Sequence, residues 1–364
     1  MKKIILVAGA RPNFIKVAPL LKEFKKNNKF FEFLLVHTGQ HYDFLMSKVF
    51  FTELSIPKPD IFLKVGSASH AVQSAKIMTK FEGLLLKERP DIVIVVGDVN
   101  STLACSLVAA KMNIKVAHVE SGLRSYDRTM PEEINRIVTD SISDFMFVSE
   151  KSGVINLRKE GVAKSKIFFV GNIMIDTLLS NWDKIQKSDI LNRLKMSRKT
   201  YAVLTLHRPS NVDSLKTIAE LYTVFSAISQ NIKIIYPIHP RTKKMMSSLG
   251  YLKKFGKISN LIMTNPLGYI DFIKLISDSS FVLTDSGGIQ EETTILRVPC
   301  LTMRNNTERP VTITEGTNKL VGRSKSVIIK EINRILTGQT TKKKNPKFWD
   351  GKTAKRIIDV LKRA

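Results

Sequence analysis

The stretch "DIVIVVGDVNSTLACSLVAAKMNIKVAHVE", residues 91–120, contains the pattern that decides the fold class. Its two ends, residues 91–98 and 114–120, are short apolar runs, and residues 100–112 between them have the pattern of a helix. A strand, a helix and a second strand in this order are typical of a parallel sheet. Because helices cover both faces of such a sheet, its strands can be almost continuously apolar.

The same alternation extends along the chain in both directions. Further strands are expected at residues 4–9, 32–38, 144–149 and 166–172, and further helices at 12–27, 69–88 and 131–142. The series then starts again, with strands at 201–207, 232–239, 261–265, 281–286 and 299–303. Because 364 residues are many for one hydrophobic core, the two series predict an α/β protein of two doubly wound domains. We assign residues 1–175 to the first domain and 176–345 to the second, and expect the terminal helix at 351–364 to join the first.

Composition limits the class of protein. A hydrophobic content of 43% with 25% charged residues is that of a folded globular chain. No apolar segment approaches the roughly 20 residues that cross a bilayer, and the apolar run at 4–9 lacks the cleavage site of a signal peptide. Cys105 and Cys300 lie in apolar stretches, which favours buried thiols over a disulfide. We therefore expect a cytoplasmic protein without membrane insertion.

The net charge of +26 is the one extreme value of the composition. Such a charge would suit nucleic acid, an anionic membrane surface or a phosphate-bearing substrate. The lysines are scattered, with one short cluster at 341–347, and no nucleic-acid-binding motif is recognisable. We interpret the charge as a property of the solvated surface and expect no nucleic-acid partner.

Ligands of doubly wound sheets bind beyond the carboxyl ends of the strands, and several polar clusters fall there. In "TDSGGIQEE" (284–292), backbone N–H groups at Ser286, Gly287 and Gly288 could bind a phosphate at the start of a helix, although a simple tight turn is an alternative. Glu291 and Glu292 follow one turn later, where they could accept from ribose hydroxyls. The arginines and lysines that could hold a diphosphate are Arg11, Lys16, Arg304 and Arg309.

Three carboxylates indicate acid–base chemistry. Asp98 and Glu120 end neighbouring strands, and Glu132 begins a helix four residues before Arg136, close enough for a pair on one helix face. The cations expected near these acids are Arg124, Arg128 and Arg136, and a purely structural salt-bridge network is the alternative. Histidines 37, 41, 118, 207 and 239 are expected at or near strand ends, and His207 could contact phosphate or carry a proton. The absence of HExxH or Cys–His spacing argues against a metal site.

Nine motifs together resemble a known family, the non-hydrolysing UDP-N-acetylglucosamine 2-epimerases, from residue 4 to about 322. They are "GARPNFIK", "HTGQHYD", "GDVNST", "HVESGLRS", "MPEEINR", "HRPSNVD", "YPIHPRT", "DSGGIQEE" and "NNTERPVT" with "GTNKLVG". The resemblance implies a GT-B-like fold, with two Rossmann-like domains and an active-site cleft between them. It also implies a UDP-sugar substrate, no redox cofactor and a homodimer. The implied reaction is anti elimination of UDP to 2-acetamidoglucal, followed by re-addition with the opposite configuration at C-2.

The resemblance also implies residue roles. The implied catalytic residues are Asp98, Glu120, Glu132, Arg136 and His207. The implied UDP contacts are Arg11, Lys16, Phe272, Ser286, Gly287, Gly288, Glu292 and Arg309. Gln40, Asp43, Arg208 and His239 stand where some members bind a second, activating UDP-GlcNAc, but Asp43 replaces a glutamine and an arginine of that site has no clear equivalent at 66–73.

Three other enzymes remain as alternatives. They are a 2-epimerase of a modified UDP-sugar (2,3-diacetamido glucuronate or 6-deoxy), a hydrolysing epimerase, and a UDP-sugar glycosyltransferase of similar fold.

Overall fold

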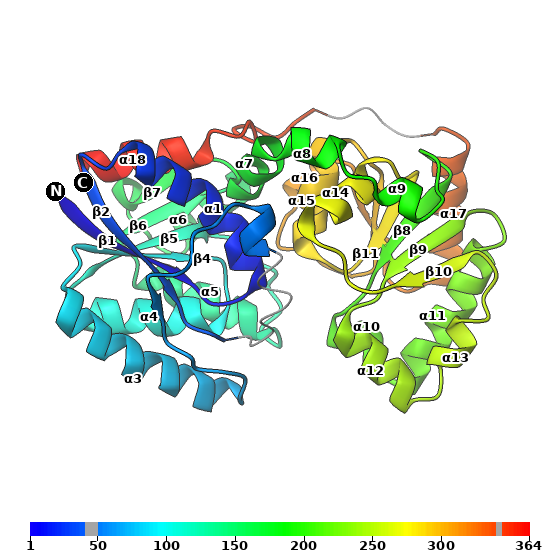
Figure 1. Cartoon of the computed structure of the whole chain (residues 1–364), viewed down its shortest axis with the longest axis horizontal. Helices are drawn as coiled ribbons and strands as arrows, with labels where there is room; N and C mark the ends of the chain where they lie inside the picture. Colours follow the sequence, from blue (N-terminus) through cyan, green and yellow to red (C-terminus); the bar gives the residue numbers. More distant parts are fainter. Residues whose placement is uncertain (41–49, 340–343) are drawn as a thin grey trace. The chain divides into compact units, whose positions relative to one another are not determined.

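A computed structural model describes residues 1–40, 50–339 and 344–364 of the chain (Figure 1). These residues divide into two compact units. Unit 1 contains Met1–Ser180 and Lys347–Ala364, and unit 2 contains Asn181–Pro346. Each unit is built on its own parallel sheet, which confirms the α/β fold class with two parallel sheets.

Unit 1 contains a seven-stranded sheet in the order β3-β2-β1-β4-β5-β6-β7. Its strands are β1 (Lys2–Ala8), β2 (Phe31–His37), β3 (Ile61–Phe62), β4 (Ile92–Val96), β5 (Lys115–Ser121), β6 (Phe145–Val148) and β7 (Ile167–Phe169). All neighbouring strands run parallel, and β4 is buried along its whole length. The strand order reverses between β1 and β4, which is where a doubly wound sheet opens a crevice for a ligand.

The helices of unit 1 cover both faces of this sheet (Figure 1). Helices α1 (Arg11–Lys26), α7 (Ile173–Ser180) and α18 (Thr353–Arg363) contact one another, as do α3 (His70–Glu88), α4 (Asn100–Lys111) and α5 (Pro131–Ser141) in turn. Helix α6 (Lys151–Lys159) and the short helix η1 (Lys164–Lys166) connect β6 to β7. Helix α5 begins with Pro131 followed by two glutamates, a sequence that favours a helix start because the helix dipole attracts negative charge there.

The carboxyl-terminal segment returns to unit 1 through polar contacts with α7 and with the residue that follows β6. The carboxylate of Asp176 accepts from the backbone N–H groups of Thr353 (3.1 Å) and Ala354 (2.8 Å), the first two residues of α18. The Trp349 indole donates to the Ser149 carbonyl at 3.0 Å. Burial raises the pKa of Asp176 to about 6, although these N–H groups oppose the rise. The side chain thus caps a helix that lies far away in sequence.

Unit 2 contains a six-stranded parallel sheet in the order β10-β9-β8-β11-β12-β13. Its strands are β8 (Tyr201–Thr205), β9 (Lys233–Pro237), β10 (Leu261–Thr264), β11 (Phe281–Thr284), β12 (Cys300–Thr302) and β13 (Asn318–Leu320). Its helices are α8 (Trp182–Gln186), α9 (Ile190–Arg193), α10 (Pro209–Val212), α11 (Leu215–Ile228), α12 (Pro240–Ser248), α13 (Leu252–Phe255), α14 (Tyr269–Ser277), α15 (Gly287–Leu296), α16 (Val311–Thr314) and α17 (Lys325–Leu336). The order reverses between β8 and β11, as it does between β1 and β4 of unit 1.

Some local details differ from the sequence-based expectations. Strands β3 and β13 were not expected, since β3 has only two residues and β13 has the mostly polar sequence NKL. His118 lies inside β5, fully buried, so its expected place at a strand end is wrong. Cys105 and Cys300 are free and buried as expected, and burial raises the pKa of both thiols, that of Cys300 to about 11. Within the described ranges, no helix combines the length and the apolar character that a membrane span requires.

Candidate active site

Lys16, Gly97 and Glu120 come together at the carboxyl ends of β4 and β5. The Lys16 ammonium donates to a carboxylate oxygen of Glu120, and the two side chains are only 7% and 1% exposed. Gly97 has a φ of 70°, and a Cβ added there would lie 2.9 Å from the Lys16 Nζ and 3.5 Å from the Glu120 Oε2. A glycine therefore permits the close approach of the ion pair. The sequence assigned Lys16 to UDP and gave no sign of this pair.

Glu120 itself has an unusual backbone conformation. Its φ is 75°, in the left-handed region, and the register of β5 against β6 shifts between Val119 and Ser121. A left-handed conformation costs a residue with a side chain about 1–2 kcal/mol. Such residues cluster at functional sites, where the surrounding structure holds them in place. The irregular strand end directs the Glu120 carboxylate toward Lys16.

Asp98 is held by two consecutive residues of α5. Its carboxylate forms an ion pair with Arg136, and its main-chain carbonyl accepts from the Asn135 side chain at 2.9 Å. Arg136 is 1% exposed, whereas Asp98 keeps 23% of its side chain exposed. Arg136 thus pairs with Asp98, as expected for one of the cations near the acids, and the possible helix-surface pair with Glu132 is not formed. Glu132 lies exposed in the first turn of α5.

The other expected cations are placed differently. Arg124 is buried and pairs with Asp140 (2.7 Å) and with Glu160 (2.6 Å), so its expected role beside Asp98 or Glu120 is wrong. Arg128 is exposed. The reason is that Asp140 of α5 and Glu160, the residue that follows α6, lie beside Arg124, which no local pattern in the sequence indicates.

The residues expected to form an allosteric site are only partly described. Gln40 is buried, and its Oε1 accepts from the backbone N–H (3.0 Å) and hydroxyl (2.7 Å) of Ser101 at the start of α4. Asp43, like His41, lies outside the described residues.

Arg11 is the first residue of α1. His37 is buried, which lowers its pKa to about 4, so this histidine is neutral at physiological pH.

In unit 2, Asp285 organises the polar residues that follow β8 and β11. Its carboxylate accepts from the backbone N–H groups of His207 (3.1 Å) and Arg208 (2.9 Å) and from the Asn211 side chain (3.1 Å). The His207 Nδ1 lies 3.1 Å from the same carboxylate. Burial acts to raise the pKa of Asp285, but the hydrogen bond and charge of His207, with the N–H groups of Arg208 and Asn211, lower it overall. This anchoring role was missed because the sequence showed Asp285 only as one member of a polar cluster.

The histidines and arginines of this region lie close together. The rings of His207 and His239 are 5.7 Å apart, and the His207 side chain is 43% exposed. His239 caps α12, since its Nδ1 accepts from the Arg241 N–H at 3.3 Å. The Arg208 Nε donates to the Asp285 carbonyl at 3.1 Å. His207 thus has both an anchored backbone and an exposed ring.

The Ser286–Gly288 segment forms the start of α15. Ser286 is the N-cap residue and makes no side-chain capping bond, and the helix begins at Gly287. A Cβ on Gly287 would lie 2.4 Å from the Arg309 Nη1, so the guanidinium lies against the first turn. Arg309 pairs with Glu291 (2.7 Å) and Glu308 (2.6 Å). An arginine beside a helix N-terminus suits a phosphate ligand.

The remaining expected UDP contacts lie on α14 and α15. Glu291 is fully buried beside Arg309 and is therefore not placed as an acceptor for ribose. Glu292 lies near Tyr269, whose pKa is raised by burial and by the charge and hydrogen bond of Glu292. Phe272 is partly buried and packs against one of the apolar clusters of unit 2.

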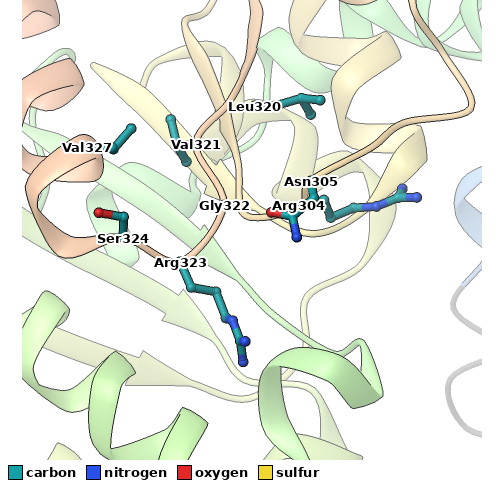
Figure 2. A pocket seen from close by; sticks show the side chains of 8 residues that line it. All are labelled: Arg304, Asn305, Leu320, Val321, Gly322, Arg323, Ser324 and Val327. Carbon is teal, nitrogen blue, oxygen red and sulfur yellow. The ribbon is translucent and has the colours of Figure 1, made fainter.

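A pocket of about 530 Å³ lies beyond β12 and β13 in unit 2 (Figure 2). The residues that line it are Arg304, Asn305, Leu320, Val321, Gly322, Arg323, Ser324 and Val327. Arg304 is the one expected cation among them, and it pairs with Glu308 at 2.8 Å. The start of α15 does not line this pocket, so the candidate phosphate site and the pocket are different places. In the part of the chain that the structure describes, no group of three or more His, Cys, Asp or Glu side chains could hold a metal ion.

Comparison with known proteins identifies the family. The family model described as UDP-N-acetylglucosamine 2-epimerase matches residues 22–362. The chain belongs to the UDP-N-acetylglucosamine 2-epimerase family. This confirms the resemblance drawn from the nine motifs.

Relatives in this 2-epimerase family match along the whole chain. The UDP-N-acetylglucosamine 2-epimerase homolog of Methanococcus maripaludis is 45% identical, and the alignment covers 99% of each chain. The UDP-2,3-diacetamido-2,3-dideoxy-D-glucuronate 2-epimerase of Pseudomonas aeruginosa is 36% identical, again over 99% of each chain. The crystal structure of Methanocaldococcus jannaschii UDP-GlcNAc 2-epimerase in complex with UDP-GlcNAc and UDP has a TM-score of 0.93 and 41% identity, with all of both chains covered. This likeness confirms the GT-B-like fold of two Rossmann-like domains.

Proposed function

We propose that the protein inverts C-2 of UDP-N-acetylglucosamine to give UDP-N-acetylmannosamine, and catalyses the reverse reaction. The observation that carries this proposal is the pairing of two carboxylates with buried cations at the switch point of unit 1, Asp98 with Arg136 and Glu120 with Lys16. Family membership supplies the reaction class, since these enzymes are C-2 epimerases.

The two units have different roles in this proposal. The start of α15 and Arg309 bind the diphosphate of UDP, because backbone N–H groups and a guanidinium both attract negative charge. Asp98 and Glu120 act on the sugar, and an opposite charge beside each favours the ionised form that a base needs. The cleft expected between the two domains stays a prediction.

The proposed chemistry has two steps. As the bond from C-1 to the diphosphate oxygen weakens, positive charge develops on the ring and acidifies the hydrogen at C-2. A carboxylate takes that proton, the electron pair of the C–H bond forms the C-1=C-2 double bond, and the pair of the C–O bond leaves with UDP. The diphosphate oxygen then attacks C-1 of 2-acetamidoglucal while a proton is delivered to the other face of C-2. The positive groups of unit 2 stabilise the departing diphosphate.

The test is incubation with UDP-GlcNAc in heavy water, followed by NMR. Deuterium at C-2 in both UDP-sugars supports the proposal, whereas release of free UDP and ManNAc indicates a hydrolysing enzyme. Asp98→Asn, Glu120→Gln and Glu132→Gln should each lower turnover about 100-fold or more with UDP binding largely kept. Glu82→Gln, on the exposed side of α3, is the matched control that keeps full activity. Near-wild-type turnover in all three site variants would remove the catalytic assignment.

A modified UDP-sugar is the second candidate substrate. The 36% identity to a UDP-2,3-diacetamido-2,3-dideoxy-D-glucuronate 2-epimerase over 99% of each chain favours it. The same deuterium assay with this sugar, a 6-deoxy UDP-sugar and UDP-GlcNAc ranks them by kcat/KM. A higher kcat/KM for either modified sugar would replace UDP-GlcNAc as the substrate.

Three finer expectations stay proposals. The homodimer is checked by light scattering in solution, and the cytoplasmic location by cell fractionation. Activation by a second UDP-GlcNAc at Gln40, Asp43, Arg208 and His239 is checked by the dependence of the rate on substrate concentration. A hyperbolic dependence would contradict activation.

A further inference from the structure

His118 has both ring nitrogens in short hydrogen bonds, although the side chain is fully buried in β5. Its Nδ1 lies 2.7 Å from the Asp140 Oδ1, and its Nε2 lies 2.7 Å from the main-chain oxygen of Gly97. A neutral imidazole has one donor and one acceptor, so the identity of the two partners decides the protonation of the ring.

Both partners can only accept. The Gly97 carbonyl carries no proton, and Asp140 forms an ion pair with Arg124 (2.7 Å) and accepts from the Gly122 N–H (3.0 Å). The ion pair with Arg124 and the hydrogen bond from the Gly122 N–H favour the ionised form of Asp140. Asp140 is therefore a carboxylate, and each nitrogen of His118 must donate.

We propose that His118 is a buried imidazolium that acts as a positioning residue for the epimerisation by holding the Gly97–Asp98 turn. The proposal rests on the proposed function, because it requires Asp98 to act on the sugar. The charged groups of this cluster balance, since His118 and Arg124 face Asp140, and Arg124 also pairs with Glu160. A buried cation is tolerable where partners of opposite charge and hydrogen bonds surround it.

The turn has contacts that connect it to two elements. Strand β5 holds the Gly97 peptide from both sides, because the Gly97 N–H donates to the Val119 carbonyl at 3.0 Å while the Gly97 carbonyl accepts from His118. Helix α5 contributes Arg136 to the Asp98 carboxylate and Asp140 to His118. His118 thus joins the strand, the turn and the helix that carries the partner of Asp98. Loss of this contact removes the support of a glycine at a φ of 70°.

The expected effect is on turnover. His118→Gln offers a single amide that cannot donate to both partners, so Asp98 shifts while the UDP-binding residues of unit 2 are unchanged. Misplacing a catalytic group by about 1 Å can cost about 100-fold in rate. We expect kcat to fall roughly 10- to 100-fold and the KM for UDP-GlcNAc to change less than about 3-fold. A role in folding alone would lower the amount of active enzyme and leave the kcat of each folded molecule unchanged.

NMR of the full chain labelled with ¹⁵N in histidine tests the charge directly. At pH 7 to 8, one histidine should show two protonated ring nitrogens, and its signals should be absent from His118→Gln. His37 is the internal control, because it should show a neutral ring in the same spectra. Asp140→Asn is the second variant, which removes the charge and offers an amide N–H that can donate to Nδ1, so the ring should become neutral in this pH range.

A neutral His118 ring in the wild-type protein at pH 7, or a wild-type kcat in folded His118→Gln, would overturn the proposal. If His118→Gln does not fold, the Asp140→Asn variant decides. A neutral His118 ring together with a wild-type kcat in that variant would also overturn the proposal. Absence of deuterium exchange by the wild-type protein with every UDP-sugar overturns the proposed function instead, and the positioning role falls with it, while the NMR still decides the charge.

Discussion

Replacing Lys16 by methionine should destabilise unit 1 strongly, because it removes the ammonium that pairs with the buried Glu120 carboxylate. The Glu120 side chain is 1% exposed and that of Lys16 is 7% exposed, so water does not screen the pair. Methionine keeps the length and apolar stem of lysine and removes the charge. The resulting defect is electrostatic and leaves the packing nearly unchanged.

The expected magnitude follows from the burial. Removing one partner of a buried ion pair costs about 3–5 kcal/mol, whereas replacing both partners by uncharged groups of similar size is often nearly neutral. Lys16→Met should therefore lower the free energy of unfolding of unit 1 by about 3–5 kcal/mol. The double variant Lys16→Met/Glu120→Gln should recover at least about 2 kcal/mol of that loss, because the amide carries no charge to desolvate.

The two tryptophans of the chain make the assay specific for each unit. Trp349 is buried in unit 1, and Trp182 begins α8 of unit 2. In a Trp182→Phe background, tryptophan fluorescence during urea unfolding reports unit 1 alone. With a urea slope of about 2 kcal/mol per M, Lys16→Met should lower the midpoint by about 1.5–2.5 M.

The comparison of the single and double variants can refute the reasoning. If Lys16→Met costs less than about 1 kcal/mol, Glu120 is not a buried charge that depends on Lys16. The same conclusion follows if adding Glu120→Gln destabilises the protein further. An unchanged midpoint for unit 2, read from Trp182 in a Trp349→Phe background, is the control that the effect is local.

Two further predictions concern unit 2. Gly287→Ala should weaken UDP binding at least 10-fold in calorimetry, because the added Cβ would lie 2.4 Å from the Arg309 Nη1. The control is Gly83→Ala, in open space within α3, which should leave binding unchanged. Equal affinities of the two variants would contradict the proposed phosphate site. Because the folded pKa of Asp285 is lowered, its contribution to stability is present above its unfolded pKa of about 4 and is lost as the pH falls through the folded value. Asp285→Asn should therefore be less stable than wild type at pH 7, with a smaller loss below pH 4, as followed by Trp182 fluorescence; equal pH dependence in the two proteins would contradict this role.

The fold was predictable because its signals are local. Residues 91–120 alone contain a strand, a helix and a strand, and the structure places β4, α4 and β5 there. The contacts of the site were not predictable in the same way. Lys16 and Glu120 are 104 residues apart, and no motif paired them. Arg136 was expected near the acids, but its partner Asp98, 38 residues away, was not singled out. Pairing at such distances depends on strand order and helix placement, which residue spacing does not encode.

The site residues differ in how far the sequence could describe them. The motifs indicated which residues are candidates, and their roles stay predictions. His118 was expected at a strand end but lies within β5, where the alternation of a strand decides which way it faces. Arg124 was expected beside the candidate acids, but Asp140 of α5 and Glu160, which follows α6, lie beside it instead. In both cases the structure identifies the side chain or backbone group that the residue contacts, and this contact changes the role inferred for the residue.

The environments of Asp98 and Asp285 predict different roles for two similar carboxylates. Asp98 follows β4, which pairs with β1, and Asp285 follows β11, which pairs with β8. In each sheet, these two strands mark the point where the strand order reverses. Asp285 is fully buried and accepts from the His207 loop through several donors, whereas Asp98 keeps 23% of its side chain exposed beside Arg136. A carboxylate saturated with fixed donors is a poor proton acceptor, and a paired but accessible one is ready to take a proton. Neutralising Asp285 should therefore reduce mainly stability, and neutralising Asp98 mainly turnover. Equal losses of kcat and of unfolding free energy in the two variants would mean that topological position, and not environment, sets their roles.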